Sequence, residues 1–169
     1  MKRFHHKGFT LVELVVVIAI IGVLAAILVP MLMNYVKKSK LKQANANAKL
    51  VFNTVTAEAQ DIMTSGDELD EEDSLASGVG IKISASMASS LSGQQKKLAE
   101  AVYDAFKQNG DSAGYCSYVF NANGALSFAQ WSRTASNNIL GQYPNPCTDP
   151  DKAIKAFSST PYDKTAWGL

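Results

Sequence analysis

Residue types that build catalytic and metal sites are scarce in this chain. Its 169 residues include two cysteines and two histidines, and both histidines, His5 and His6, lie in a basic N-terminal segment. The chain has no zinc-type spacing, no glycine-rich phosphate loop and no nucleophile with a base and a third orienting group. The formal charge of +1 offers no global basic surface for nucleic acid. The sequence therefore predicts no enzyme, no cofactor and no metal site, and it does not demonstrate a nucleic-acid partner.

Polar side chains are absent from one long stretch near the N-terminus. Residues 14–33 form an apolar run that only Gly22 and Pro30 interrupt. At about 1.5 Å per helical residue, this run covers roughly the 30 Å of a bilayer core. The single charge between Lys7 and Lys37 is Glu13, at the start of the run. A charge at the edge of a membrane span is costly and usually functional.

The segment before the apolar run is basic. Residues 1–8 contain Lys2, Arg3 and Lys7 and no acidic residue. Such an end stays in the cytoplasm under the positive-inside rule, so the rest of the chain is expected to face outward. A secretory signal is cut after its apolar core, whereas the conspicuous junction here, Gly8–Phe9, lies before the core.

The segment from Lys7 to Pro30, KGFTLVELVVVIAIIGVLAAILVP, resembles the N-terminus of the type IV prepilin family. In that family a membrane-embedded prepilin peptidase cuts after the glycine, and the new N-terminal residue is N-methylated. The resemblance implies cleavage after Gly8 and methylation of Phe9. It also implies that the Glu13 carboxylate pairs with the terminal amine of a neighbouring subunit and selects the register of assembly.

Two interpretations of Glu13 remain open. Cleavage would give Phe9 a free amine four residues before Glu13, on the same helix face. The alternative is a glutamate at the headgroup level of a simple anchor. Gly22 and Pro30 both weaken a helix. They predict either local unwinding in a filament, which the resemblance also implies, or a tolerated kink.

Apolar residues continue beyond the span at helical spacing. No proline interrupts residues 31–63, so one helix from near Phe9 to near Ile62 is expected, about 80 Å long. Its second half is expected to be amphipathic and to pack on a folded head. The apolar stripe comprises Leu41, Ala44, Ala48, Val51, Val55, Ala59 and Ile62.

An acidic segment follows this helix. Six of the seven residues from Asp67 to Asp73 are carboxylates. Calcium binding is one interpretation, because hard cations take clustered carboxylates. The segment lacks the alternating spacing of a calcium loop, so a solvated connection is favoured.

The head contains signals for both helices and strands. A short strand is expected at Val79, Ile81 and Ile83, and Ser92 with Gln95 predicts the capping box of a second helix that ends before Gly110. The apolar stripe of that helix is Leu98, Ala101, Val102, Ala105 and Phe106.

The clearest strand signal is a hairpin. Residues 115–120 and 125–131 flank a turn-rich connection that ends in Asn-Gly. Aromatic side chains are expected to fill the packed face of this sheet; a sugar-binding or surface-binding cluster is the alternative. These aromatic residues are Tyr118, Phe120, Phe128 and Trp131.

The two cysteines are Cys116 and Cys147. Outside the membrane, two cysteines indicate one disulfide, worth about 3 to 4 kcal/mol in the chain-entropy model. Many type IV pilins have a disulfide-bounded loop near the C-terminus, so the resemblance also implies this bond. Two separate thiols are the alternative.

The expected fold class is α+β, with a long N-terminal helix packed on a small head that contains an antiparallel sheet. Residues 1–8 form the leader, 9–36 the transmembrane or filament-core helix, 37–63 its amphipathic continuation and 64–169 the head.

Three functions fit this organisation. The favoured one is a structural subunit of a type IV pilus. Such a chain is first a single-pass membrane protein, is processed by a prepilin peptidase and N-methyltransferase, and is polymerised by an assembly platform into a cell-surface filament, for example in cell adhesion. The second is a pseudopilin of a type II secretion or DNA-uptake (competence) apparatus. The third is a surface-binding module that the helix merely anchors.

Overall fold

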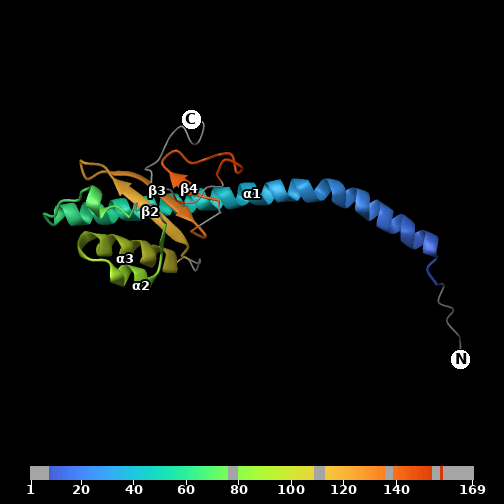
Figure 1. The fold of residues 1–169 in the computed structure, drawn as a ribbon, viewed down its shortest axis with the longest axis horizontal. Coiled ribbons are helices and arrows are strands. Elements are labelled where there is room, and N and C mark those ends of the chain that lie inside the picture. The colour runs from blue at the N-terminus through green and yellow to red at the C-terminus, as the bar shows by residue number, and fades with distance from the viewer. Residues whose placement is uncertain (1–7, 76–79, 109–112, 136–138, 154–156, 158–169) are drawn as a thin grey trace, which may run out of the picture. The chain divides into compact units, whose positions relative to one another are not determined.

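The computed structural model describes residues 8–75, 80–108, 113–135, 139–153 and 157 (Figure 1). The chain divides after Lys37 into two compact units. Helix α1 (Leu11–Thr64) has 54 residues and supplies segments to both units. The long N-terminal helix and the antiparallel sheet of the head confirm the expected α+β fold class.

In the first unit, α1 exposes its apolar residues. The helix continues through Gly22 and Pro30 without a break. Side chains from Leu11 to Val36 are exposed, including large aliphatic ones such as Leu11 (78%) and Val23 (64%). Packing within this unit therefore does not bury the apolar run.

In the second unit, the expected amphipathic stripe of α1 is confirmed. The buried residues of α1 are the seven that the spacing predicted, from Leu41 to Ile62. Six of them, all but Leu41, belong to the main hydrophobic core of the head. Burial of this stripe, at about 25 cal/mol per Å² of apolar surface, stabilises the docking of α1 on the head.

The sheet of the head has four antiparallel strands in the order β1-β2-β3-β4 (Figure 1). They are β1 (Ile81–Lys82), β2 (Tyr115–Phe120), β3 (Leu126–Ser132) and β4 (Gly141–Tyr143). The predicted hairpin is β2 and β3. In its turn, the Asn121 side-chain oxygen accepts hydrogen bonds from the backbone N–H groups of Asn123 and Ala125, both at 3.0 Å. Gly124 has a φ of 72°, where glycine is favoured.

One face of this sheet packs on the helices. Trp131 pairs with Cys116 in register, and Tyr118 with Ala129, so these four side chains share a face and join the core with α1. Helix α3 (Gly93–Gln108) buries Leu98, Val102 and Phe106 in the same core. Of the four aromatic residues predicted for the packed face, Tyr118, Phe120 and Trp131 join the core, whereas Phe128 does not. That residue pairs with Val119 and points to the opposite face, because each step along a strand changes face.

The start of α3 differs from the expected capping box. The Gln95 amide donates to the carbonyl of Glu72 in the acidic segment, so it ties two parts of the head together. A further helix, α2 (Ala85–Ser90), was not predicted; the Ser84 hydroxyl caps it by accepting from the Met87 N–H at 3.3 Å. Val79 and Gly110 lie outside the described residues, while Ile81 lies in β1 and buried Ile83 follows it.

Strand β4 crosses directly over α1. Gly141 lies on the core-facing side of the sheet, opposite Trp131. A Cβ added at Gly141 would lie 2.0 Å from the backbone carbon of Ala44 and 2.1 Å from its oxygen. The strand and the helix therefore touch backbone to backbone, and glycine is required there.

Asn45 on α1 completes this contact. Its side-chain oxygen accepts from the backbone N–H of Gln142 at 3.1 Å, and its amide donates to the carbonyl of Cys147 at 2.8 Å. Next along α1, the rings of Phe52 and Tyr143 pack edge to face with 5.1 Å between their centroids. These contacts attach α1 to β4 and to the loop after it.

Candidate functional site

The predicted processing point lies immediately before α1. Gly8, Phe9 and Thr10 are exposed and precede the first helical residue, Leu11. A Cβ on Gly8 would meet nothing within 4 Å, and 79% of Phe9 is exposed. The Gly8–Phe9 peptide bond is thus accessible in this unit. The basic residues Lys2, Arg3 and Lys7 lie outside the described residues.

Thr10 and Glu13 form a reciprocal capping box at the start of α1. The Thr10 hydroxyl accepts from the Glu13 backbone N–H at 3.2 Å. One Glu13 carboxylate oxygen, Oε2, accepts from the Thr10 backbone N–H at 2.9 Å and from the Thr10 hydroxyl at 2.7 Å. The pattern Thr-x-x-Glu before an apolar run is the sequence signature of this motif. Thr10 was not among the predicted site residues, although this signal identifies it.

The capping box leaves part of the Glu13 carboxylate available. Both contacts from Thr10 go to Oε2, and within the part of the chain that the structure describes, Oε1 has no hydrogen-bond donor. A carboxylate has about four lone-pair sites, so Glu13 can hold the helix start and also accept a cationic donor from outside.

The segment after Glu13 has the length and composition of a membrane span. Among the described residues, α1 is the one helix that is long and apolar enough to cross a membrane. Gly22 and Pro30 lie inside it with regular helical neighbours, and a Cβ on Gly22 would meet nothing within 4 Å. Local unwinding between Gly22 and Pro30 in a filament therefore stays a prediction.

The acidic segment is organised by its own backbone and by α3. Asp70 accepts from the Glu72 N–H at 2.8 Å, and Asp67 lies 3.9 Å from the Lys97 ammonium group. Residues Glu71–Asp73 form a short 3-10 helix, η1. No group of three or more metal-ligating side chains occurs in the described ranges. Glu68, Asp70 and Glu72 are exposed, as a solvated connection requires.

The predicted disulfide is wrong. Cys116 and Cys147 are not bonded to each other. Cys116 lies on β2 in the main core, whereas Cys147 packs with Leu41 and Ala153 in a separate small cluster. Cysteine count and compartment indicate that a bond is permitted, but they carry no information on which core each thiol enters.

The Cys116 thiol is expected to be unreactive in the folded protein. Burial raises the pKa of Cys116 to about 12, and the thiolate is the reactive form. We expect Cys116 to resist alkylation by iodoacetamide at pH 7 until the protein unfolds, and thermal unfolding to occur at the same temperature with and without reductant. A Cys116–Cys147 peptide pair in a non-reducing digest of the folded protein would contradict this.

Comparisons with known proteins point to the same N-terminal segment. A family model described as the prokaryotic N-terminal methylation motif matches residues 3–29, a range that contains Gly8, Phe9 and Glu13. No solved structure matches the chain.

Among curated proteins, the chain is similar to pilins and fimbrial proteins. It is 45% identical over 54 residues to the type IV major pilin protein of Myxococcus xanthus. These 54 residues are 31% of this chain and 24% of that protein. It is 54% identical over 37 residues to a type IV major fimbrial protein of Dichelobacter nodosus, covering 22% and 24%. A type IV major alpha-pilin of Moraxella bovis is 62% identical over 34 residues, covering 20% and 21%. The matches thus span about a quarter of the relatives' length.

Proposed function

The chain carries the N-terminal segment of the type IV pilins, and from this premise we propose that it is a structural subunit of a type IV pilus. It is inserted in the membrane by residues 9–36, is cut between Gly8 and Phe9 by a prepilin peptidase, and is N-methylated at Phe9. An assembly platform in the membrane then polymerises it into a surface filament.

The observation that carries this proposal is the exposed apolar surface of α1. From Leu11 to Val36 no residue is buried in the unit that contains it. Apolar surface on this scale marks contact with a membrane or with other proteins. A lipid bilayer covers it before assembly, and the same segments of neighbouring copies cover it in the filament core.

Glu13 gives this assembly its register. A carboxylate moved from water or headgroups into an apolar filament core costs several kcal/mol unless it is paired. Cleavage creates an α-amine on Phe9 in the neighbouring copy, which is a donor of opposite charge. Only a copy placed at the correct axial offset brings this amine to Glu13, so misaligned copies are disfavoured.

Gly22 and Pro30 have a separate role in the proposal. Proline removes one helical hydrogen bond and glycine lowers helix propensity by about 1 kcal/mol. Within the filament, the segment between them unwinds locally and lets the apolar helices pack at the required length. In the membrane the same segment stays helical, because lipid offers the backbone no other hydrogen-bond partner.

The test is the location and form of the protein on cells. Material sheared from the surface should contain long fibres, visible by electron microscopy and labelled by an antibody against the head. A chain that stays in the membrane fraction, with no long fibre, would contradict the pilus assignment and favour the pseudopilin, which forms short fibres.

A further inference from the structure

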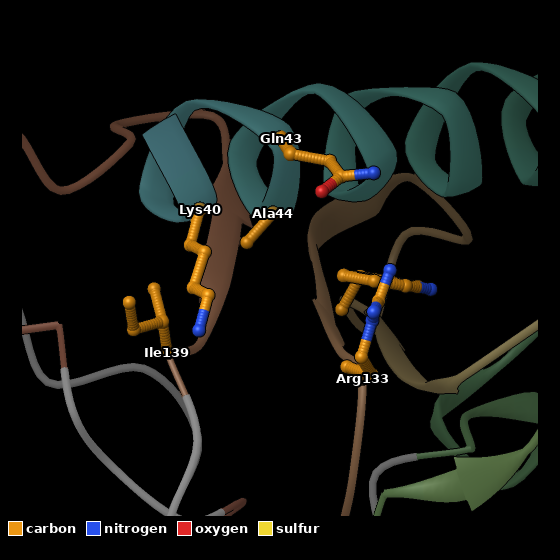
Figure 2. Close-up of a pocket in the computed structure, with 6 residues that line it drawn as sticks. Lys40, Gln43, Ala44, Arg133 and Ile139 are labelled. Atoms are coloured by element: carbon orange, nitrogen blue, oxygen red, sulfur yellow. The ribbon is translucent and has the colours of Figure 1, made fainter. Parts of the chain in front are cut away.

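A hollow with two cations lies where α1 meets the end of β3. Its volume is about 130 Å³. Figure 2 shows Lys40 and Gln43 extending from α1 and Arg133 standing on the other side of the hollow, after β3. Trp131, Ala44 and Ile139 supply an apolar wall. All six residues belong to the second unit.

The two cations have no acidic partner among the residues of this unit that the structure describes. Lys40 and Arg133 are exposed, and no described carboxylate lies within ion-pair distance of either. Arg133 offers a planar fork of donors, Lys40 a point charge, and Gln43 an amide donor. The hollow is therefore suited to one carboxylate group held against an apolar wall.

Complementary charges lie at the other end of the same unit. Glu68 and Glu72 in the acidic segment are exposed, and their carboxylates have no partner among the described residues. Helical rise places Lys40 and Thr64, which precedes this segment, about 36 Å apart along α1. The acidic segment cannot reach the hollow of its own chain. It can reach that of a second copy displaced along the helix direction.

We infer that the Lys40–Arg133 hollow binds the acidic segment of a neighbouring copy, with the carboxylate of Glu68 or Glu72 between the two cations. This contact is heterologous: one end of a subunit meets the opposite end of the next, which generates a helical filament when the arrangement does not close. The inference rests on the proposed pilus function and names the head contact that this function leaves open.

The contact is first tested by zero-length cross-linking. A carbodiimide couples a lysine amine to a carboxylate only when the two touch. Treatment of sheared wild-type fibres is expected to give a peptide that joins Lys40 to Glu68 or Glu72. This peptide joins two copies, because Lys40 lies about 36 Å along α1 from Thr64, which precedes the acidic segment. Lys40→Arg keeps the charge and removes the amine, so it should assemble and lose this product. Absence of the product in wild-type fibres would overturn the inference.

Charge exchange is the second test. Two double variants reverse the charge on one side of the contact: Lys40→Glu/Arg133→Glu in the hollow and Glu68→Lys/Glu72→Lys in the acidic segment. Each should lower the fibre yield at least about tenfold, since like charges across an interface oppose binding. The chain with all four changes should recover most of the yield. Lys42→Glu, which alters an exposed lysine outside the hollow, is the matched control and should assemble normally.

Other outcomes are distinguishable. Unchanged yield in the hollow variant, or no recovery in the fourfold variant, would overturn the inference and leave the pilus function intact. If the hollow variant assembles normally but loses binding to phosphatidylglycerol vesicles, the hollow serves a lipid headgroup instead. Wild-type cells without fibres would contradict the proposed function itself, and the inference with it.

Discussion

Replacement of Glu13 by alanine is expected to leave membrane insertion and cleavage intact and to lower the yield of surface fibres at least about a hundredfold. Breaking a buried ion pair by removing one partner costs about 3 to 5 kcal/mol, because the remaining charge stays desolvated. In the proposed filament that remaining charge is the Phe9 amine of the neighbouring copy. The measurement is the amount of this chain in sheared material divided by the amount in the membrane fraction.

The capping box gives this experiment its control. Glutamine can occupy the same position of a capping box, so Glu13→Gln should keep the bonds with Thr10 and lose only the charge. Thr10→Ala should keep the charge and lose the cap. If Glu13 acts through its charge, Glu13→Gln fails to assemble and Thr10→Ala assembles. The reverse result would mean that Glu13 serves the start of the helix alone.

Replacement of Gly141 by valine is expected to destabilise the head by about 3 to 5 kcal/mol, at the upper end of what a single substitution does. The new Cβ would lie 2.0 Å from the backbone of Ala44, where no side-chain rearrangement can make room. Separating β4 from α1 would also break both Asn45 hydrogen bonds. The full-length protein in detergent should unfold at least about 10 °C lower, followed by circular dichroism.

Two variants make this test specific. Gly22→Ala places a Cβ in open space within a helix and should leave the unfolding temperature of the head unchanged. Ala44→Gly combined with Gly141→Val should not recover stability, because the clash is with the backbone of Ala44 and not with its side chain. An unfolding temperature for Gly141→Val equal to that of the wild type would show that β4 does not contact α1 in this way.

Periodic patterns predicted much of this structure. The seven buried residues of α1 follow helical spacing over more than 20 residues, so the burial of each is supported by its neighbours. The hairpin was predicted for similar reasons, with β-rich segments on both sides of an Asn-Gly turn. In both cases the decisive interactions are local in sequence.

Contacts between distant segments were not predictable in this way. Asn45 lies beside the apolar stripe of α1, and only the fold shows that it joins Gln142 and Cys147 across about 100 residues. The disulfide prediction was wrong for the same reason. Cys116 and Cys147 are buried in separate clusters, and this depends on how distant segments pack. Phe128 is a different case: it lies three residues before Trp131 on β3, so strand alternation already places it on the opposite face.

The functional residues also differ in how far the sequence alone could predict them. Gly8, Phe9 and Glu13 were predicted from a contiguous motif, whereas the hollow is built from Lys40 on α1 and Arg133 after β3, which are far apart in the sequence. The hollow therefore became visible only with the fold.

The most direct test of the central claim is the mass of the N-terminal peptide of this chain in fibres sheared from cells. We expect a chain that begins at Phe9 and carries one added methyl group on its α-amine. Fibres built from a chain that still begins at Met1, or from one cut after the apolar run, would contradict it.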